Sequence, residues 1–428
     1  MATQAEAAPA QQSVRAVLWI LLIVYIFNFI DRQIVNILAE PIRLELGLSD
    51  TQIGLMTGLA FALFYTVLGI PIARYADRPT SRRPLIIAVA LAIWSGMTAI
   101  SGMAQNFGQL LLARIGVGVG EAGCTPAAHS LIADMVPKEK RSSALAFYAL
   151  GIPIGGLLGL VIGGLLADWI GWRLAFVAVG LPGVGLALLV LAVLKEPRRT
   201  GGLLQTDASR KTLGGAETLK AIFGSKALVL LIAGGSFAAF LAYGKVTWTT
   251  IFFQRTHGLT PGEVGLWFGL VNGLAGAAGT YLGGWVADKY GAVNRRHVLT
   301  APAIGMAIAA PAALFAYSLQ SWELAMVVLI IPTVCNSLYY GPFYSSVQGL
   351  VPLSARAMAS AVTLFCQNLI GLGLGPLFFG MMSDWLKPEY GEGSVQIVLY
   401  AGALLGLLPA FFFWRGSLRL NEELDQKD

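Results

Sequence analysis

The sequence predicts an all-α membrane protein with twelve transmembrane helices in two parallel six-helix bundles and both termini in the cytoplasm. Three observations predict it: the composition, the length of the apolar runs and the distribution of basic residues. Of the 428 residues, 56% are hydrophobic and only 12% are charged, against about 25% charged residues in soluble domains. Too few polar side chains remain to cover a water-exposed surface. The composition therefore excludes a soluble enzyme, a nucleic-acid-binding protein and a disordered chain.

Twelve apolar runs are long enough to cross a membrane, which takes about 20 mostly apolar residues in a helix. Their continuity predicts helices, because the strands of a membrane barrel alternate apolar and polar residues over about ten positions. The predicted spans are 16–38, 52–73, 84–104, 108–132, 142–167, 173–194, 227–252, 263–287, 297–316, 322–349, 356–382 and 394–414.

Lysine and arginine accumulate in every second connection between these runs. With the N-terminus in the cytoplasm, the cytoplasmic segments hold 22 of them and the outer segments hold 4. Basic residues favour the cytoplasmic side, so both termini are predicted to lie there. This orientation explains the net charge of +6 without nucleic acid. The longest polar stretch predicts an N-terminal bundle (1–194), a cytoplasmic linker (195–226) and a C-terminal bundle with a short tail (227–428).

Three pairs of short motifs recur at nearly equal distances, each at the same place among the six spans of its half. The pairs are Asp77-Arg78 with Asp288-Lys289, 211 residues apart, 136–141 with 351–356, 215 apart, and Asp168-Trp169 with Asp384-Trp385, 216 apart. Both copies begin on the same side of the membrane. The halves are therefore predicted to be parallel repeats.

The loop 73–83 and its counterpart 284–296 resemble the cytoplasmic loop signature of the major facilitator superfamily. Ala73 and Thr80 replace glycines of that signature, and the second copy has an insertion before its basic pair. The resemblance implies halves related by an axis along the membrane normal and a gate on the cytoplasmic side. A loop that only orients the chain would not require an aspartate at the same point of each half. The implied gate residues are Asp77, Arg78, Arg141, Asp288 and Arg356.

Five charged residues lie well inside the predicted spans, away from the span ends: Asp31, Arg32, Arg114, Glu121 and Lys245. A charge at mid-span costs about 2.5–3.5 kcal/mol on insertion scales, so each of these residues is a candidate for a functional site. Lys245 is the weakest candidate, because it lies near the outer end of its span, where a lysine can extend its amine to the interface.

The other four charges fall on two polar helix faces. Asn28, Asp31 and Arg32 share one face of the first span. We expect this face to oppose Arg114 and Glu121 of the fourth span across a cavity, with Glu121 a turn or more from either arginine. At least one of Asp31 and Glu121 is then expected to take up and release protons. A purely structural ion pair between the two spans is the alternative.

The second half offers neutral polar and aromatic groups but no carboxylate at mid-span. We therefore expect proton chemistry in the first half and substrate contacts in the second. Tyr339, Tyr340 and Phe343 are the candidates for an apolar shelf, while Arg32 and Arg114 would hold an anionic group. The glycine-lined face of the fifth span is expected to leave room for a substrate's tail. Ordinary aromatic packing is the alternative for the shelf.

The segments 28–32, 114–122 and 133–141 together resemble the Spinster branch of the major facilitators, whose members are known as exporters of lysolipids and sphingosine-1-phosphate. The resemblance implies a proton-coupled carrier for an amphiphilic, anionic, lipid-like molecule. It assigns proton coupling to Asp31 and Glu121, and substrate binding to Asn28, Arg32 and Arg114. The short polar tails are typical of a bacterial protein of the inner membrane.

A proton-coupled multidrug or organic-anion exporter is the alternative within the same class. A channel or sensor is disfavoured, because the polar groups cluster near mid-depth instead of forming a continuous lining. An intramembrane enzyme would need a second carboxylate close to Asp31 or a pair of histidines. No ATPase motif is present, so transport is expected to draw on ion gradients. We expect a monomer among membrane lipids, with no cofactor, no metal and no nucleic-acid partner.

Overall fold

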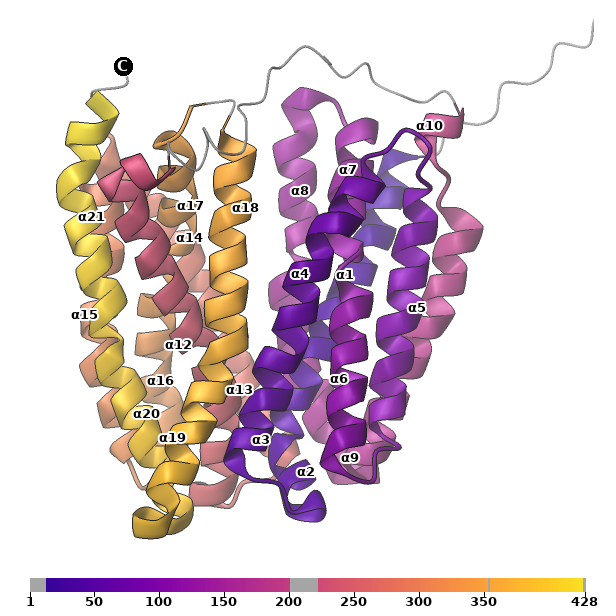
Figure 1. Cartoon of the computed structure of the whole chain (residues 1–428). Helices are drawn as coiled ribbons and strands as arrows, with labels where there is room; N and C mark the ends of the chain where they lie inside the picture. The colour runs from indigo at the N-terminus through magenta and orange to yellow at the C-terminus, as the bar shows by residue number, and fades with distance from the viewer. Residues whose placement is uncertain (1–12, 201–221, 353–354, 426–428) are drawn as a thin grey trace, which may run out of the picture.

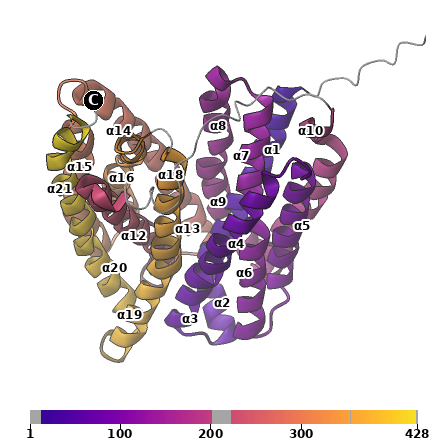
Figure 2. The same cartoon turned by 45° about the horizontal axis from the view of Figure 1, so that its top comes forward.

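The computed structural model describes residues 13–200, 222–352 and 355–425, and within these ranges the regular structure is entirely helical. Two groups of helices stand side by side (Figure 1). They approach each other closely at the lower end of the view and stand apart at the upper end, near which the described chain ends. Figure 2 tilts this upper end forward and shows two separate clusters.

The first group holds the helices that precede residue 201. They are α1 (Val14–Ile37), α2 (Ala39–Leu46), α3 (Asp50–Gly54), η1 (Leu55–Leu59), α4 (Ala60–Ala76), α5 (Arg83–Ser101), α6 (Phe107–Glu121), α7 (Cys124–Met135), η2 (Lys138–Lys140), α8 (Arg141–Ala149), α9 (Gly151–Val193) and α10 (Pro197–Thr200).

The second group follows residue 221. Its helices are α12 (Lys226–His257), α13 (Pro261–Leu270), η3 (Val271–Ala275), α14 (Gly276–Gly291), α15 (His297–Ser318), α16 (Trp322–Ser337), α17 (Tyr340–Gly349), α18 (Arg356–Cys366), η4 (Gln367–Leu374), α19 (Gly375–Tyr390), η5 (Gly391–Gly393), α20 (Ser394–Leu405) and α21 (Leu407–Asp425).

Eight helical stretches among the described residues are long and apolar enough to cross a membrane. Two of them, Arg141–Val193 and Met358–Leu420, each hold two of the predicted spans. Within the first, Gly171 has φ 77° and ψ 160°, a conformation that only glycine adopts readily. The chain turns back there. The predicted spans 108–132 and 263–287 are not among the eight, so the total of twelve stays a prediction.

Several helices are broken where polar residues lie inside the protein. The predicted fourth span divides into α6, which ends at Glu121, and α7, which begins at Cys124. Three others contain wider π-helical turns, η1, η3 and η4. Such turns occur often at functional sites. The break in the fourth predicted span places Glu121 at the C-terminal end of α6.

The glycine-rich face of α9 packs directly on α1. A Cβ atom added to Gly155 would meet Ile26 and Phe29, and one added to Gly159 would meet Ile30 and Gln33. The expected room for a substrate's tail along this face is therefore wrong. Small residues serve here to bring two helix backbones together.

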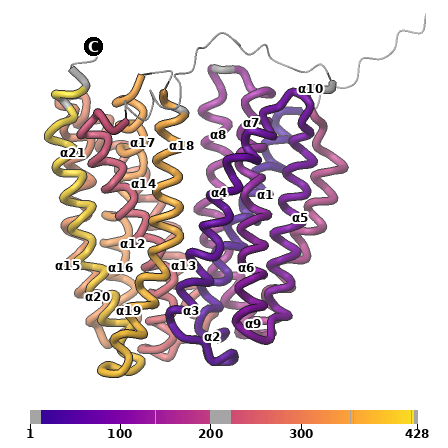
Figure 3. The backbone as a smooth tube through the Cα atoms, viewed as in Figure 1, coloured from indigo at the N-terminus to yellow at the C-terminus, as the bar shows by residue number. Residues whose placement is uncertain are grey.

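The two groups meet along two glycine seams at the end remote from α10 and α21. Gly54 and Gly58 of α3 and η1 approach the backbone of Pro376 and Gly373, and Figure 3 shows α3 beside α19 at this end. The second seam joins Gly265 of α13 to the backbone of Leu160 in α9. Each glycine starts or ends a Gly-x-x-x-Gly motif (54–58 and 265–269), a pattern that permits close helix contact. The motifs lie 211 residues apart.

Candidate functional site

A cluster of buried polar side chains lies between α1 and α6, in the first group of helices. Asn28 and Asp31 belong to α1, Arg114 and Glu121 belong to α6, and all four are at most 1% exposed. Each sits on a helix whose remaining residues are mostly apolar, so desolvating these groups opposes folding unless they are paired. Their clustering within one membrane bundle marks a candidate functional site.

Arg32 forms the ion pair of this cluster. Its Nε atom donates to Oε2 of Glu121 at 2.6 Å. The expectation that Glu121 lies a turn or more from both arginines is therefore wrong. The guanidinium of Arg32 also lies 4.9 Å from the ring centre of Phe61 and 4.5 Å from that of Tyr65. These rings hold the cation beside the carboxylate.

The other members of the cluster keep unused hydrogen-bonding capacity. Among the described residues, neither carboxyl oxygen of Asp31 has a partner, and the same is true of Oε1 of Glu121 and of Nε and Nη1 of Arg114. Thr98 lies beside the Asp31 carboxyl. Buried polar groups without partners are rare in proteins and call for an explanation. A site that exchanges protons or binds a polar ligand provides one.

A pocket next to this cluster is lined by both groups of helices. Arg32 and Arg114 line it from the first group, together with Phe61, while Tyr243 and Thr247 line it from α12. The two arginines therefore face the second group, although Arg32 is already paired. The pocket encloses only about 20 Å³, room for about one water molecule, so a substrate would have to widen it. A substrate bound there would contact both halves, which is what a carrier needs in order to couple binding to their relative motion.

At the edge of the pocket that faces the glycine seams, hydrogen bonds between α1 and α12 tie the two groups together. Thr247 donates to Oδ1 of Asn36 at 2.8 Å, and Thr250 donates to the carbonyl oxygen of the same residue at 2.9 Å. Farther down, Arg255 of α12 pairs with Glu40 at 2.7 Å and with both carboxyl oxygens of Asp50 at 2.6 and 2.9 Å. This end of the molecule is closed by charged and polar contacts.

Two aspartates complete the closure by capping helix N-termini across the interface. Asp384 of α19 accepts hydrogen bonds from the backbone N–H groups of Asp50 and Thr51, at the start of α3. Asp168 of α9 accepts from the Thr260 hydroxyl and from the backbone N–H of Gly262, at the start of α13. A carboxylate at a helix N-terminus satisfies free N–H groups and interacts favourably with the helix dipole.

The three aromatic residues of the expected shelf differ in how deeply they are buried. Tyr339 and Phe343 are buried in an apolar cluster of the second group and pack on Phe413. Tyr340 is 39% exposed and stacks on Tyr339. None of the three lines the pocket beside Arg32. For Tyr339 and Phe343, the alternative of ordinary packing describes their surroundings better than a shelf does.

Sequence reasoning missed Phe61 and Tyr65 around Arg32, Tyr243 opposite it, and the two glycine seams that close one end of the molecule. The two aromatic residues of α4 are four positions apart, the spacing of one helix face. The seams carried a readable signal in their two Gly-x-x-x-Gly motifs. Tyr243 had none, because its position depends on how the two groups of helices pack.

The expected gate residues lie at the opposite, separated end. Asp77 and Asp288 are exposed at the ends of α4 and α14. Arg141 donates to the carbonyl oxygen of Val136 and Arg356 to that of Gln348, each within its own group. No ion pair among the described residues joins the two groups here. We expect Asp77 to face the start of α18 near residues 354–357 when this end closes. Residue 354 lies outside the described residues, and formation of the contact in another state stays a prediction.

Next to Asp77, a buried ion-pair network ties the start of the predicted linker to the first group. Arg83 is fully buried and pairs with Asp134 at 2.6 Å and with the carboxylate of Glu196. Arg198 also pairs with Asp134, at 2.8 Å. Burial raises the pKa of Glu196, but hydrogen bonds from Arg83 outweigh this effect and hold the pKa below its usual range.

The model of the Major Facilitator Superfamily matches residues 21–376 and, in a second match, residues 247–421. The chain belongs to this superfamily. A solved bacterial homologue of the human lysosomal transporter Spinster, in an inward-facing and unoccupied conformation, has a TM-score of 0.87, 31% sequence identity and coverage of 96% of this chain and 98% of its own. An efflux pump of the major facilitator type from Mycolicibacterium smegmatis is 34% identical over 96% of this chain and 94% of its own length.

Vertebrate relatives point to the same branch of the superfamily. Protein spinster homolog 1 of Xenopus laevis is 25% identical over 96% of this chain and 82% of its own length. The predicted Spinster-like major facilitator is therefore confirmed, and so are a transporter instead of an enzyme and a multi-pass protein of the bacterial inner membrane.

Proposed function

We propose that this chain is a proton-coupled secondary transporter that moves an amphiphilic, anionic, lipid-like substrate by alternating access. It would cross the membrane twelve times as a monomer, as two parallel six-helix bundles with both termini in the cytoplasm. In that orientation the separated end faces the cytoplasm and the seams close the outer side. The observation that carries the proposal is the Arg32–Glu121 ion pair at the pocket shared by the two halves.

The ion pair suggests how protons and substrate exchange. While Glu121 is ionised, it occupies the guanidinium of Arg32. A proton on Glu121 cancels its charge and frees Arg32 to bind an anionic group, which guanidinium can hold through two parallel hydrogen bonds. Asp31, buried without a partner, would be the second proton acceptor, and Arg114, with two unpaired N–H-bearing atoms, the second anion ligand. Asn28 would orient the carboxylates.

An exporter of drugs or organic anions remains the second candidate. The observation that favours it is the burial of Tyr339 and Phe343, because the expected apolar shelf for a lipid tail is largely absent from the pocket. The efflux pump of Mycolicibacterium smegmatis, which covers nearly the whole chain, points the same way. Both candidates use the same arginines and differ in the length of the apolar part of the substrate.

Transport into proteoliposomes tests both parts of the proposal. Uptake of lysophosphatidylglycerol, lysophosphatidylcholine and the organic anion fluorescein is measured with and without a pH gradient. We expect a pH gradient to drive the lysolipid with the anionic head group. Asp31→Asn and Glu121→Gln should abolish this pH-driven uptake and leave a folded protein. Glu139→Gln, an exposed carboxylate outside the site, serves as the control.

Undiminished pH-driven transport in both variants would remove proton coupling through these carboxylates. Transport of fluorescein without transport of any lysolipid would instead favour the organic-anion exporter. Arg114→Lys separates the role of the anion ligand, because a lysine cannot reproduce the two-pronged contact of a guanidinium. We expect it to weaken binding of phosphate-headed lipids while uptake remains responsive to the pH gradient.

A further inference from the structure

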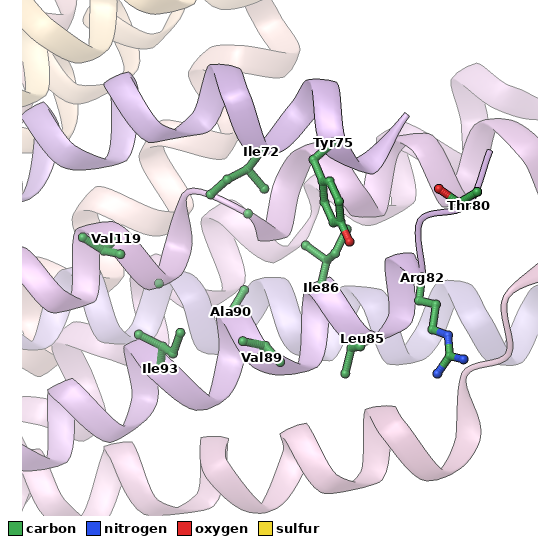
Figure 4. A pocket seen from close by; sticks show the side chains of 12 residues that line it. Ile72, Tyr75, Thr80, Arg82, Leu85, Ile86, Val89, Ala90, Ile93 and Val119 are labelled. Carbon is green, nitrogen blue, oxygen red and sulfur yellow. The ribbon is translucent and has the colours of Figure 1, made fainter. Parts of the chain in front are cut away.

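A second pocket lies on the face of the first group that points away from the second group, between α4, α5 and α6 (Figure 4). It encloses about 430 Å³, within the range of about 300–1,000 Å³ typical of small-molecule sites. Figure 1 places α5 on the side of the molecule away from α12–α21. This pocket is therefore separate from the Arg32 site, which lies between the two halves, and it faces the surrounding membrane.

The pocket is a groove with an apolar length and one polar end. Its walls include Leu85, Val89 and Ile93, which project from one face of α5 and are 42–47% exposed. Thr80 and Arg82 lie at the end where α5 begins (Figure 4). Nothing else in the described chain covers these side chains. An apolar groove with a polar end in contact with lipid matches an amphiphilic occupant.

The charge at the polar end of the groove indicates which class of amphiphile it binds. Arg82 is the only charged residue among the twelve that line the groove. It is exposed, and no ion pair involving it occurs among the described residues. The adjacent Arg83 is fully buried and holds Glu196 and Asp134. The basic pair at this point of the loop is therefore divided, with one arginine stabilising the fold and the other left available to an external anion.

We propose that this groove binds one anionic phospholipid of the cytoplasmic leaflet. The phosphate would lie at Arg82 and the Thr80 hydroxyl, and an acyl chain would follow Leu85, Val89 and Ile93 toward the middle of the membrane. Basic pockets between helices at the cytoplasmic surface bind anionic head groups in this way. The inference depends on the orientation proposed above but on neither the transported substrate nor proton coupling.

The base of the groove connects the lipid to the transport site. Gly120 and Gly123 line it, and they flank Glu121 at the break between α6 and α7. A Cβ atom added to Gly123 would lie only 3.3 Å from Ile72 and 3.4 Å from Ile86. Both isoleucines line the groove and pack directly against the break, so an occupant of the groove would act on the break through them. A bound lipid would thus stabilise one arrangement of the segment that carries Glu121.

Native mass spectrometry of the purified full-length transporter tests the site by counting bound lipids. The probes are dioleoyl-phosphatidylglycerol and dioleoyl-phosphatidylcholine, which share their chains and differ in charge, and inorganic phosphate as a competitor. We expect one phosphatidylglycerol to bind more tightly than phosphatidylcholine. Arg82→Gln should weaken it roughly five-fold, the effect of one arginine near an anionic head group. Val89→Trp should weaken both lipids by filling the groove.

Two matched variants complete the design. Arg15→Gln removes an exposed arginine at the start of α1, and Leu188→Trp enlarges an exposed apolar residue of α9. Neither should change lipid binding. An equal loss in Arg15→Gln and Arg82→Gln would show diffuse surface attraction and overturn the site. Wild-type affinity in both groove variants, or displacement of the lipid by inorganic phosphate alone, would overturn it as well.

Discussion

Arg32 and Arg114 are both arginines of a membrane bundle, and both lie near Glu121, yet only Arg32 is paired with it. The difference follows from the helix that carries each one. Arg32 extends from α1 across to the end of α6, whereas Arg114 and Glu121 are seven residues apart on one helix, about 10 Å along its axis. The carboxylate therefore neutralises the arginine of the neighbouring helix and leaves the arginine of its own helix unsatisfied.

This asymmetry predicts unequal effects of the two carboxylates on stability. Glu121→Gln leaves Arg32 without its anion and should destabilise the protein by about 3–5 kcal/mol, as breaking a buried ion pair does. Asp31→Asn removes a carboxylate that has no ion pair and should cost far less. Thermal unfolding in detergent measures both. Equal losses would mean that Asp31 also stabilises an arginine.

Phe343 and Tyr340 lie in the same helix, α17, and their substitution distinguishes a role in packing from a role in substrate contact. Phe343 is fully buried against Phe413, so Phe343→Ala should lower stability by about 3–5 kcal/mol. Tyr340→Ala should lower stability by less than Phe343→Ala does, because Tyr340 is 39% exposed. If Tyr340 contacts a lipid tail, the affinity of its alanine variant should fall as the chain lengthens, by about 0.8 kcal/mol for each CH₂ left unburied. Binding across a series of chain lengths checks this.

At the scale of elements, the network around Arg83 joins α5, α7 and the segment that follows α9. The guanidinium is fully buried and receives two carboxylates from distant parts of the chain. Such a network is costly to break, because the remaining charge stays buried without compensation. It fixes the first turn of the linker to the first half, so the relative motion of the halves must be taken up after residue 198.

The lowered pKa of Glu196 predicts how this network responds to acid. A carboxylate whose pKa is lower in the folded state adds stability above its usual pKa of about 4.3 and loses it as the pH falls through the folded value. Glu196→Gln should therefore lower the melting temperature at pH 7, and the difference from the wild type should shrink below about pH 4. Glu139→Gln, at an exposed position, should change little at either pH. A constant difference across this range would contradict the network's role.

At the scale of the whole molecule, the two halves are held together at one end only. The seams, the bonds of Asn36 and the Arg255 pairs all lie on the side remote from α10 and α21. The expected gate residues on the other side are bound within their own halves or exposed. A solved Spinster homologue of the same fold was captured in an inward-facing conformation. Alternation would exchange one set of contacts for the other.

The role of the glycine seams in holding the two halves together can be tested by replacing a seam glycine with a larger residue. Gly265→Leu should prevent close contact with Leu160 and shift the population toward a state open on the outer side. Distances between spin labels at the turn of α9 near Gly171 and at the start of α13 should lengthen. Gly156→Leu is the control, since nothing lies within 4 Å of a Cβ atom at that position. Unchanged distances in Gly265→Leu would show that the seam does not limit opening.

Asp77→Ala should act in the opposite direction. Its carboxylate is expected to reach the start of α18 when the cytoplasmic side closes, where the helix dipole stabilises an anion by about 0.3–1 kcal/mol. Loss of this contact favours the inward-open state, so labels on the cytoplasmic ends of α4 and α18 should move apart on average. If they do not, Asp77 has no gating role.

The sequence predicted the charged residues at mid-span but not how they pair, and it did not single out Asp50 or Arg83, which are fully buried. Asp31 and Glu121 stood out because mid-span carboxylates are rare. The Arg32–Glu121 pair could not be predicted, because it depends on the vertical offset between α1 and α6 and on the helix break after Glu121. The burial of Phe343 beside the exposed Tyr340 depends likewise on packing against Phe413. The repeated Asp168 and Asp384 were visible, but their role as caps required the contacts between halves.

These two aspartates have a consequence for the origin of the protein. Each half donates one carboxylate to a helix N-terminus of the other and receives one in return, and the glycine seams are exchanged in the same way. Reciprocal use of one patch by two partners defines the isologous interface of a symmetric dimer. A single ancestral six-helix unit could therefore have assembled with its own copy through this contact. Gene duplication and fusion would then have preserved an existing dimer interface, and the two halves could afterwards diverge, one keeping the buried charges and the other losing them.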